Sequence, residues 1–349
     1  MKLLFILLTV FNFAVKTPSD VPGKGGLDAD FIINIKGASS GSLQHCTFEY
    51  KDGKKWKSAG PGLEIKKYSK KEIATLIQSF TVKKPSDSIR VRITCPEEAG
   101  KVSLQTGTWG KPQIICYPGI KVKDTKRVAV VGNSFTFFSS SEFFLKRLSR
   151  LHGHQMEMSA SLKGGQCLLQ HTKLERTQDL LNSSYDVIIL QDQSQAAAKL
   201  AAAPDENQFV LEGARELSGA FRKNSPKARI IYECTWSYVG KTGDFGGFDS
   251  LENFDRLLRE GSRTVVEKTV DINEMSPVGH AFETARAEGI NLYYKDNKHQ
   301  GQLGSYLKAC VNFLFIYGEP FDEKLDLDCG IKHETAAALR KIATKTVLK

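Results

Sequence analysis

The sequence lacks the features of several large classes of protein. After residue 15 no segment is long and apolar enough to span a membrane. None of the seven cysteines stands in CxxC spacing, and histidines and carboxylates do not cluster at metal-ligand spacing, so we expect no metal and no cofactor. The lysines come in short pairs, without an arginine cluster or interleaved aromatic residues, so nucleic acid is not an expected partner.

Positive charge is plentiful but uneven. The formal net charge is +10, and residues 28–120 hold 15 Lys and Arg against 9 Asp and Glu. Such a surplus could favour acidic partners such as uronic-acid polysaccharides or anionic surfaces. The alternative, which we prefer, is a lysine-rich face in contact with solvent.

The first 15 residues, MKLLFILLTVFNFAV, carry Lys2 and then an apolar run that is too short to cross a bilayer comfortably. This pattern predicts a secretory signal peptide that is removed near Ala14. The mature protein would then be secreted or periplasmic, where one or two disulfides are plausible, most simply within the first domain. The sequence assigns neither their partners nor an oligomeric state.

Residues 27–120 have the pattern of short strands separated by turns. Alternating apolar residues predict strands at 31–37, 88–95, 101–109 and 112–117, and residues 46–56 predict a hairpin around Asp52-Gly53. This spacing indicates a small all-β sandwich domain. We interpret it as a scaffold; the alternative is a carbohydrate-binding module in which Trp56 or Trp109 stacks on sugars.

Residues 121–349 change to strands alternating with helices. Short apolar runs predict strands at 127–131, 155–162, 185–191 and 228–236. Apolar stripes of helical period predict helices at 141–153, 207–223, 250–268 and 304–318. The stretch AAAKLAAAP, residues 196–204, is expected to be a loop or the beginning of a helix. This order predicts a parallel sheet with helices on both faces, a three-layer α/β/α sandwich.

The stretch VVGNSFTFF, residues 130–138, places Gly132, Asn133 and Ser134 between a strand and a helix. In an open parallel sheet, ligands bind beyond the carboxyl ends of the strands. A serine there could be a nucleophile whose N–H, at a helix N-terminus, favours negative charge. The alternative is a capping serine, which is far commoner.

Asp296 and His299 lie three residues apart in LYYKDNKHQGQLGSYL, just before the last strongly apolar helix. A serine nucleophile needs a base, and the base needs a partner that fixes its tautomer. An acid three residues before a histidine can turn back and hold one ring nitrogen. The alternative is an ordinary polar surface turn.

Together GNSFT, LQDQS, PVGHAF and LYYKDNKHQGQLGSYL resemble the SGNH (GDSL-like) serine esterase superfamily, in particular a branch long catalogued as a domain of unknown function. The resemblance covers about residues 126–318. It implies a flavodoxin-like parallel sheet, Ser134 as nucleophile, His299 as base and Asp296 as the orienting acid.

The resemblance also implies an oxyanion hole made by the Ser134 N–H, a glycine N–H and an amide side chain. Gly164 and Gly165 both fit the glycine, and Gly165 is preferred. Gln193 stands where the superfamily has asparagine, with Gln191 as the alternative donor. The sequence departs from the superfamily's pattern at two positions. Gln193 replaces an asparagine, and Gln300 replaces a proline that supports the shape of the loop.

His280 has no acid at a matching offset, so we expect it to line the cleft or cap a helix. The sequence thus predicts an exported serine esterase that hydrolyses small acyl or methyl esters, on carbohydrate by analogy. Small-molecule or polysaccharide esters are the expected partners. The alternatives are a lipid esterase and a non-catalytic glycan-binding protein built on the same frame.

Overall fold

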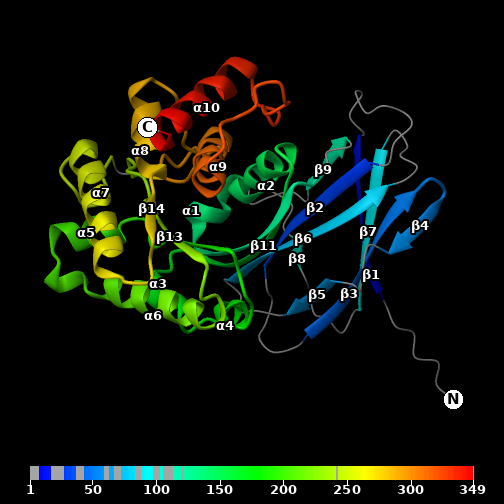
Figure 1. The fold of residues 1–349 in the computed structure, drawn as a ribbon, viewed down its shortest axis with the longest axis horizontal. Helices are drawn as coiled ribbons and strands as arrows, with labels where there is room; N and C mark the ends of the chain where they lie inside the picture. Colours follow the sequence, from blue (N-terminus) through cyan, green and yellow to red (C-terminus); the bar gives the residue numbers. More distant parts are fainter. Residues whose placement is uncertain are drawn as a thin grey trace. The chain divides into compact units, whose positions relative to one another are not determined.

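The computed structural model describes residues 8–16, 27–36, 43–58, 63–66, 72–82, 88–96, 103–104, 113–118, 122–240 and 243–348. The chain divides into two units, residues 1–121 and 122–349 (Figure 1). Trp109 and residues 1–7 of the proposed signal peptide lie outside the described residues.

The described part of the first unit consists of antiparallel strands. They are β1 (Leu8–Lys16), β2 (Leu27–Lys36), β3 (Leu43–Asp52), β4 (Lys55–Ser58), β5 (Leu63–Lys66), β6 (Glu72–Val82), β7 (Ser88–Pro96), β8 (Ser103–Leu104) and β9 (Gln113–Pro118). One sheet has the order β1-β7-β3-β4, with β5 also paired to β3, and β2 pairs with β6, β8 and β9. The all-β prediction for this region is confirmed.

The predicted hairpin is the β3–β4 pair, in which Asp52 faces Lys55 and Gly53 has a positive φ of 60°. The guanidinium of Arg92 lies 4.5 Å from the ring centroid of Trp56. This is a cation–π contact within the unit. The scaffold and the carbohydrate-binding roles of the unit both stay predictions.

The second unit is built on five parallel strands. They are β10 (Asp124–Gly132), β11 (His154–Lys163), β12 (Val187–Leu190), β13 (Arg229–Glu233) and β14 (Glu274–Ser276), in the order β14-β13-β12-β10-β11. Every residue of β12 and the last five of β10 are buried, because helices cover both faces of the sheet. The predicted α/β class is therefore confirmed.

Ten α-helices belong to the described part of this unit. They are α1 (Ser134–Phe137), α2 (Ser141–Leu151), α3 (Leu168–His171), α4 (Glu175–Leu181), α5 (Ala196–Ala202), α6 (Phe209–Asn224), α7 (Leu251–Lys268), α8 (Val278–Ala287), α9 (Gln302–Tyr317) and α10 (His333–Val347). Helices α2, α9 and α10 lie on one side of the sheet, and α3, α4 and α6 lie on the other (Figure 1).

Helix α9 is the central helix of its layer. Twelve of its 16 residues are buried, and it ends at Gly318, whose φ of 67° is the left-handed conformation that glycine adopts without strain. In the part of the chain that the structure describes, no helix combines the length and apolarity needed to cross a bilayer. The carboxyl ends of the parallel strands meet at one edge of the sheet, where β10 leads directly into α1.

Candidate active site

Ser134 is the first residue of α1 and is partly exposed. The side chain that caps this helix is that of Asn133, whose Oδ1 accepts a hydrogen bond from the Phe135 N–H at 3.1 Å. The capping role is therefore filled by the neighbouring residue, and the Ser134 hydroxyl is available for another partner. Gly132 is required before them, because a Cβ there would lie 2.6 Å from Thr136 Oγ1.

His299 is the partner of that hydroxyl. Its Nε2 lies 2.8 Å from Ser134 Oγ, and its Nδ1 lies 2.7 Å from Asp296 Oδ2. The other oxygen of Asp296 accepts the backbone N–H groups of Lys298 at 3.1 Å and His299 at 3.0 Å. Asn297 makes this tight turn possible with a φ of 57°. The structure thus brings the three residues of the predicted triad into one hydrogen-bonded chain.

The electrostatics suit a neutral base beside an ionised acid. Burial lowers the pKa of His299 below its ordinary value, and the Asp296 carboxylate only partly opposes this effect. Burial alone would raise the pKa of Asp296, but hydrogen bonds from the His299 ring and from the N–H groups of His299 and Lys298 outweigh it and lower the pKa. At neutral pH, His299 can therefore accept a proton while Asp296 holds its other nitrogen.

Aromatic rings fix the plane of the histidine. The ring of Phe138 stacks on that of His299 with centroids 4.3 Å apart, and Phe135 meets it edge-on at 5.5 Å. Phe135 in turn stacks on Trp236 at 4.3 Å, and the Trp236 indole donates to the Lys298 carbonyl at 3.2 Å. The sequence interpretation missed this support, although the signal was present in the aromatic residues of FTFF.

Gln300 joins the loop of the base to the turn of the nucleophile. It is fully buried, and its Nε2 donates to the carbonyls of Phe135 at 3.0 Å and Phe138 at 2.8 Å. The departure from proline at this position therefore supplies two donors that a proline would lack. Its role reaches beyond the shape of its own loop.

Asn133 also joins the two loops that were predicted to complete an oxyanion hole. Its Nδ2 donates to the carbonyl of Gln166 at 3.0 Å, after Gly164 and Gly165, and to the carbonyl of Asp192 at 2.9 Å, before Gln193. Gly165 has a φ of 75°, which favours glycine. Asn133 thereby holds the loops of Gly165 and Gln193 next to Ser134.

The Gln193 side chain is turned toward its own loop. Its Oε1 accepts the Gln195 N–H at 2.9 Å, and its Nε2 makes a long 3.3 Å contact with Ser194 Oγ. The described contacts do not link this amide to Ser134. Its predicted role as an oxyanion donor stays a prediction and requires the amide to exchange that long contact for the substrate.

Gln191 requires a correction. Its side chain is fully buried, its Oε1 accepts from the Asn133 N–H at 3.0 Å and from Thr136 Oγ1 at 2.9 Å, and its Nε2 donates to Asn133 Oδ1 at 3.1 Å. Its second N–H donates to the Asp192 carbonyl, so no part of the amide is left for a substrate. Gln191 therefore supports Asn133, and the prediction of an alternative substrate-facing donor was wrong.

His280 lies on α8, where its Nδ1 is 3.3 Å from Glu283 Oε2, and 44% of its side chain is exposed. None of the contacts described for the second unit joins it to the triad, so its cleft-lining role stays a prediction.

The described residues contain no group of three or more His, Cys, Asp or Glu side chains that could hold a metal ion. Cys167, Cys234, Cys310 and Cys329 are free thiols. The side chains of Cys46, Cys95 and Cys116, where a disulfide was expected, lie outside the described residues.

A serine, a histidine and a carboxylate joined in this order occur in hydrolases of several unrelated folds. The geometry therefore defines a class of site without naming a family. No family model matches the chain, and no curated protein matches its sequence.

Solved structures match the fold. A DUF4886 family protein from Bacteroides uniformis is 20% identical with a TM-score of 0.54, and the match covers 64% of this chain and 95% of that chain. A provisionally assigned GDSL-like lipase from Parabacteroides merdae is 17% identical with a TM-score of 0.43, covering 58% and 99% of the two chains. A family two carbohydrate esterase from Clostridium thermocellum, in complex with cellohexaose, is 12% identical with a TM-score of 0.39, covering 84% and 91%.

The first of these structures shows that the chain shares the fold of a DUF4886 protein. At 20% identity this likeness shows a shared fold, and the predicted α/β fold agrees with it.

Proposed function

We propose that the protein is a carboxylic ester hydrolase with Ser134 as its nucleophile. The observation that carries this proposal is the hydrogen-bonded chain from Ser134 Oγ to His299 Nε2 at 2.8 Å and from His299 Nδ1 to Asp296 Oδ2 at 2.7 Å. Distances of this length are those at which a base removes the proton of a nucleophile.

In the first half of the reaction, Ser134 Oγ attacks the ester carbonyl carbon while His299 Nε2 takes the hydroxyl proton. The electron pair of the carbonyl π bond moves to the oxygen, which becomes an oxyanion. When this intermediate collapses, the bond to the alcohol breaks and the alcohol leaves with the proton from His299. Asp296 stays ionised and stabilises the protonated imidazole throughout.

In the second half, water attacks the acyl group on Ser134 and gives its proton to His299. The bond between the acyl carbon and Oγ then breaks, the acid leaves, and the serine regains its proton. We propose that the N–H groups of Ser134 and Gly165 and the Gln193 amide bind the oxyanion. Neither of those two N–H groups has a hydrogen-bond partner within the described part of the chain, so both are free to donate.

We further propose small acyl or methyl esters on carbohydrate as substrates. This choice rests on the resemblance stated from the sequence and on the all-β unit that precedes the catalytic one; a fold by itself does not fix a substrate. Lipid esters are the second choice. A purely glycan-binding protein is disfavoured, because the serine, histidine and aspartate are all present and in contact.

The test is hydrolysis of 4-nitrophenyl acetate by the wild type and by Ser134→Ala, with correct folding checked by circular dichroism. We expect hydrolysis by the wild type and its loss in the variant. Equal rates in the two proteins would contradict the proposal, because the activity would then not depend on the serine.

Export is a separate proposal. In the structure, Leu8–Lys16 form β1 and pair with β7 along their whole length. Removal of a signal near Ala14 would delete most of this strand. Mass spectrometry of the N-terminal peptide from protein recovered outside the cells tests the proposal: a chain that begins near residue 15 supports it, and a retained β1 sequence contradicts it.

A further inference from the structure

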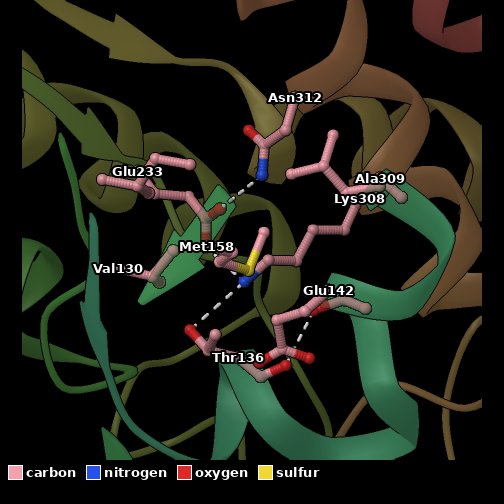
Figure 2. A pocket seen from close by; sticks show the side chains of 11 residues that line it. Val130, Thr136, Glu142, Met158, Glu233, Lys308, Ala309 and Asn312 are labelled. Atoms are coloured by element: carbon pink, nitrogen blue, oxygen red, sulfur yellow. Dashed lines mark hydrogen bonds and ion pairs between the residues drawn. The ribbon is translucent and has the colours of Figure 1, made fainter. Parts of the chain in front are cut away.

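A buried ion pair between Lys308 and Glu233 lies beside Thr136, two residues after the nucleophile (Figure 2). The Lys308 ammonium, on α9, is 2.6 Å from Glu233 Oε1 at the end of β13, and the two side chains are 5% and 0% exposed. Asn312, one helical turn further along α9, donates to the other Glu233 oxygen at 2.9 Å. The Asn312 Oδ1 accepts from Ser276 at 2.8 Å. These contacts hold Lys308 in one place, since a buried charge is stable only when it is paired and hydrogen-bonded.

The same ammonium contacts the residues that directly follow the nucleophile. Lys308 Nζ donates to the Phe135 carbonyl at 2.9 Å and lies 3.4 Å from Thr136 Oγ1. Its three N–H donors therefore match three acceptors. Helix α1 has only four residues, which is too short to be stable by its own hydrogen bonds. Its geometry must come from side chains outside it, and among the described contacts Lys308 brings a charged group to this helix.

A cavity of about 20 Å³, room for roughly one water molecule, lies beside the ammonium. The Glu142 carboxyl of α2 faces this cavity (Figure 2). Burial raises the pKa of Glu142 to about 7, although Lys308 acts to lower it. Glu233, at 2.6 Å, is the carboxylate that pairs with the Lys308 ammonium.

We infer that Lys308 is a positioning residue for the reaction. Glu233, which Asn312 also binds, holds Lys308 in place. Lys308 in turn fixes the Phe135 carbonyl, and so the direction in which α1 presents the Ser134 hydroxyl and N–H to the ester. This inference rests on the proposed function. Lys308 touches no substrate, so its loss should lower kcat and leave KM nearly unchanged.

The test uses the double variant Lys308→Met/Glu233→Gln. The single variant Lys308→Met leaves a buried carboxylate without a counter-charge and can fail to fold. The double variant removes both charges of the pair. The glutamine at position 233 keeps an oxygen that can accept the hydrogen bond from Asn312. We expect a thermal midpoint close to that of the wild type, KM for 4-nitrophenyl acetate within about twofold, and kcat lower by about tenfold to a hundredfold.

Arg340→Met is the matched control. Arg340 of α10 is also buried, with 3% of its side chain exposed, and pairs with Glu323 at 2.6 Å and Asp328 at 2.9 Å, away from α1. Its loss should lower the thermal midpoint and leave kcat unchanged. Wild-type kcat in the double variant, or an equal loss of kcat in Arg340→Met, would overturn the inference.

Amide hydrogen exchange over residues 134–138 gives a readout that needs no activity. Exchange should be faster in the double variant and unchanged in Arg340→Met. If the wild type shows no hydrolysis dependent on Ser134, the proposed function fails, and the exchange experiment still decides whether Lys308 holds the turn. Unchanged exchange in the double variant would overturn the inference.

Discussion

At the scale of single residues, Asn133 and Ser134 of the Gly132-Asn133-Ser134 turn have different roles. Asn133 caps α1 and fastens two loops, while Ser134, one position later, contacts His299. The sequence left open whether the serine was a cap or a nucleophile, because both roles need a small polar residue in the same place. The choice depends on a histidine 165 residues away, which no local pattern contains.

The pH dependence of the rate should report His299. Its pKa lies below the ordinary value of 6.5 because the ring is partly buried. The base is active when neutral, so kcat/KM should rise with pH, reach half its maximum below pH 6.5 and stay level through neutral pH. Initial rates on 4-nitrophenyl acetate measure this profile. A midpoint well above the ordinary value would contradict the assignment of His299 as the base.

Gln193 tests the oxyanion hole. If its amide turns from Ser194 to the developing oxyanion, Gln193→Ala should lower kcat by about a hundredfold to a thousandfold. Gln208→Ala serves as the control: the Gln208 Nε2 donates to the exposed Pro204 carbonyl at 2.8 Å, and none of the described contacts joins this amide to the triad. An unchanged kcat in Gln193→Ala would leave the oxyanion to backbone N–H groups alone.

At the scale of elements, the central strands were readable from the sequence. Runs predicted at 127–131, 155–162, 185–191 and 228–236 correspond to β10, β11, β12 and β13, because each is apolar and bounded by turns. The three-residue strand β14 has no apolar run and was missed. For the alanine-rich stretch 196–204, the sequence predicted either a loop or the beginning of a helix. It forms α5, as the high helix propensity of alanine favours.

Helix α7 packs closely on α5 at a glycine. A Cβ on Gly261 would lie 1.8 Å from the Ala197 carbonyl oxygen, and a backbone atom cannot move away as a flexible side chain can. We expect Gly261→Ala to cost about 1–3 kcal/mol or more, seen as a thermal midpoint several degrees lower.

Gly219→Ala is the matched control for this crossing. A Cβ on Gly219, within α6, would meet only Asp271 Oδ2 at an ordinary 3.6 Å. This substitution should be neutral or slightly stabilising, because alanine favours the helix. Equal effects of the two substitutions would contradict the account of the α5–α7 contact.

At the scale of the whole molecule, the sequence predicted the two kinds of architecture but not the buried polar network. Lys308 stands in an apolar helical stretch, where a lysine is usually taken as a solvent-facing residue. Its partner Glu233 is 75 residues away in the chain, and Asn312 reaches the same carboxylate across 79 residues. Such a network depends on the packing of β13, α9 and α1, which no periodicity in the sequence encodes.

Asp192 should make the stability of the folded protein depend on pH. Burial raises its pKa from the ordinary 3.8 to about 7, against the opposing effect of the Leu168 and Gln193 N–H groups. The folded state therefore binds this proton more tightly than the unfolded state, and the resulting stability is lost as pH rises through about 7. We expect the free energy of unfolding to fall by a few kcal/mol between about pH 5 and about pH 8.

Denaturant unfolding at the two pH values measures this change, with Asp192→Asn as the comparison. The asparagine oxygen can still accept from Leu168 and Gln193, but the side chain does not titrate. Its pH dependence should be flatter than that of the wild type. The same slope in both proteins would show that Asp192 is not the group responsible.

The proposed function requires that His299 activates Ser134 as a nucleophile. The most direct measurement is covalent labelling with a fluorophosphonate, a reagent that phosphonylates activated serines, followed by mass spectrometry of the digested protein. We predict a single phosphonyl adduct on Ser134 in the wild type and its loss in His299→Ala. An unlabelled Ser134, or labelling that is equal in the two proteins, would show that His299 does not activate Ser134 as a nucleophile.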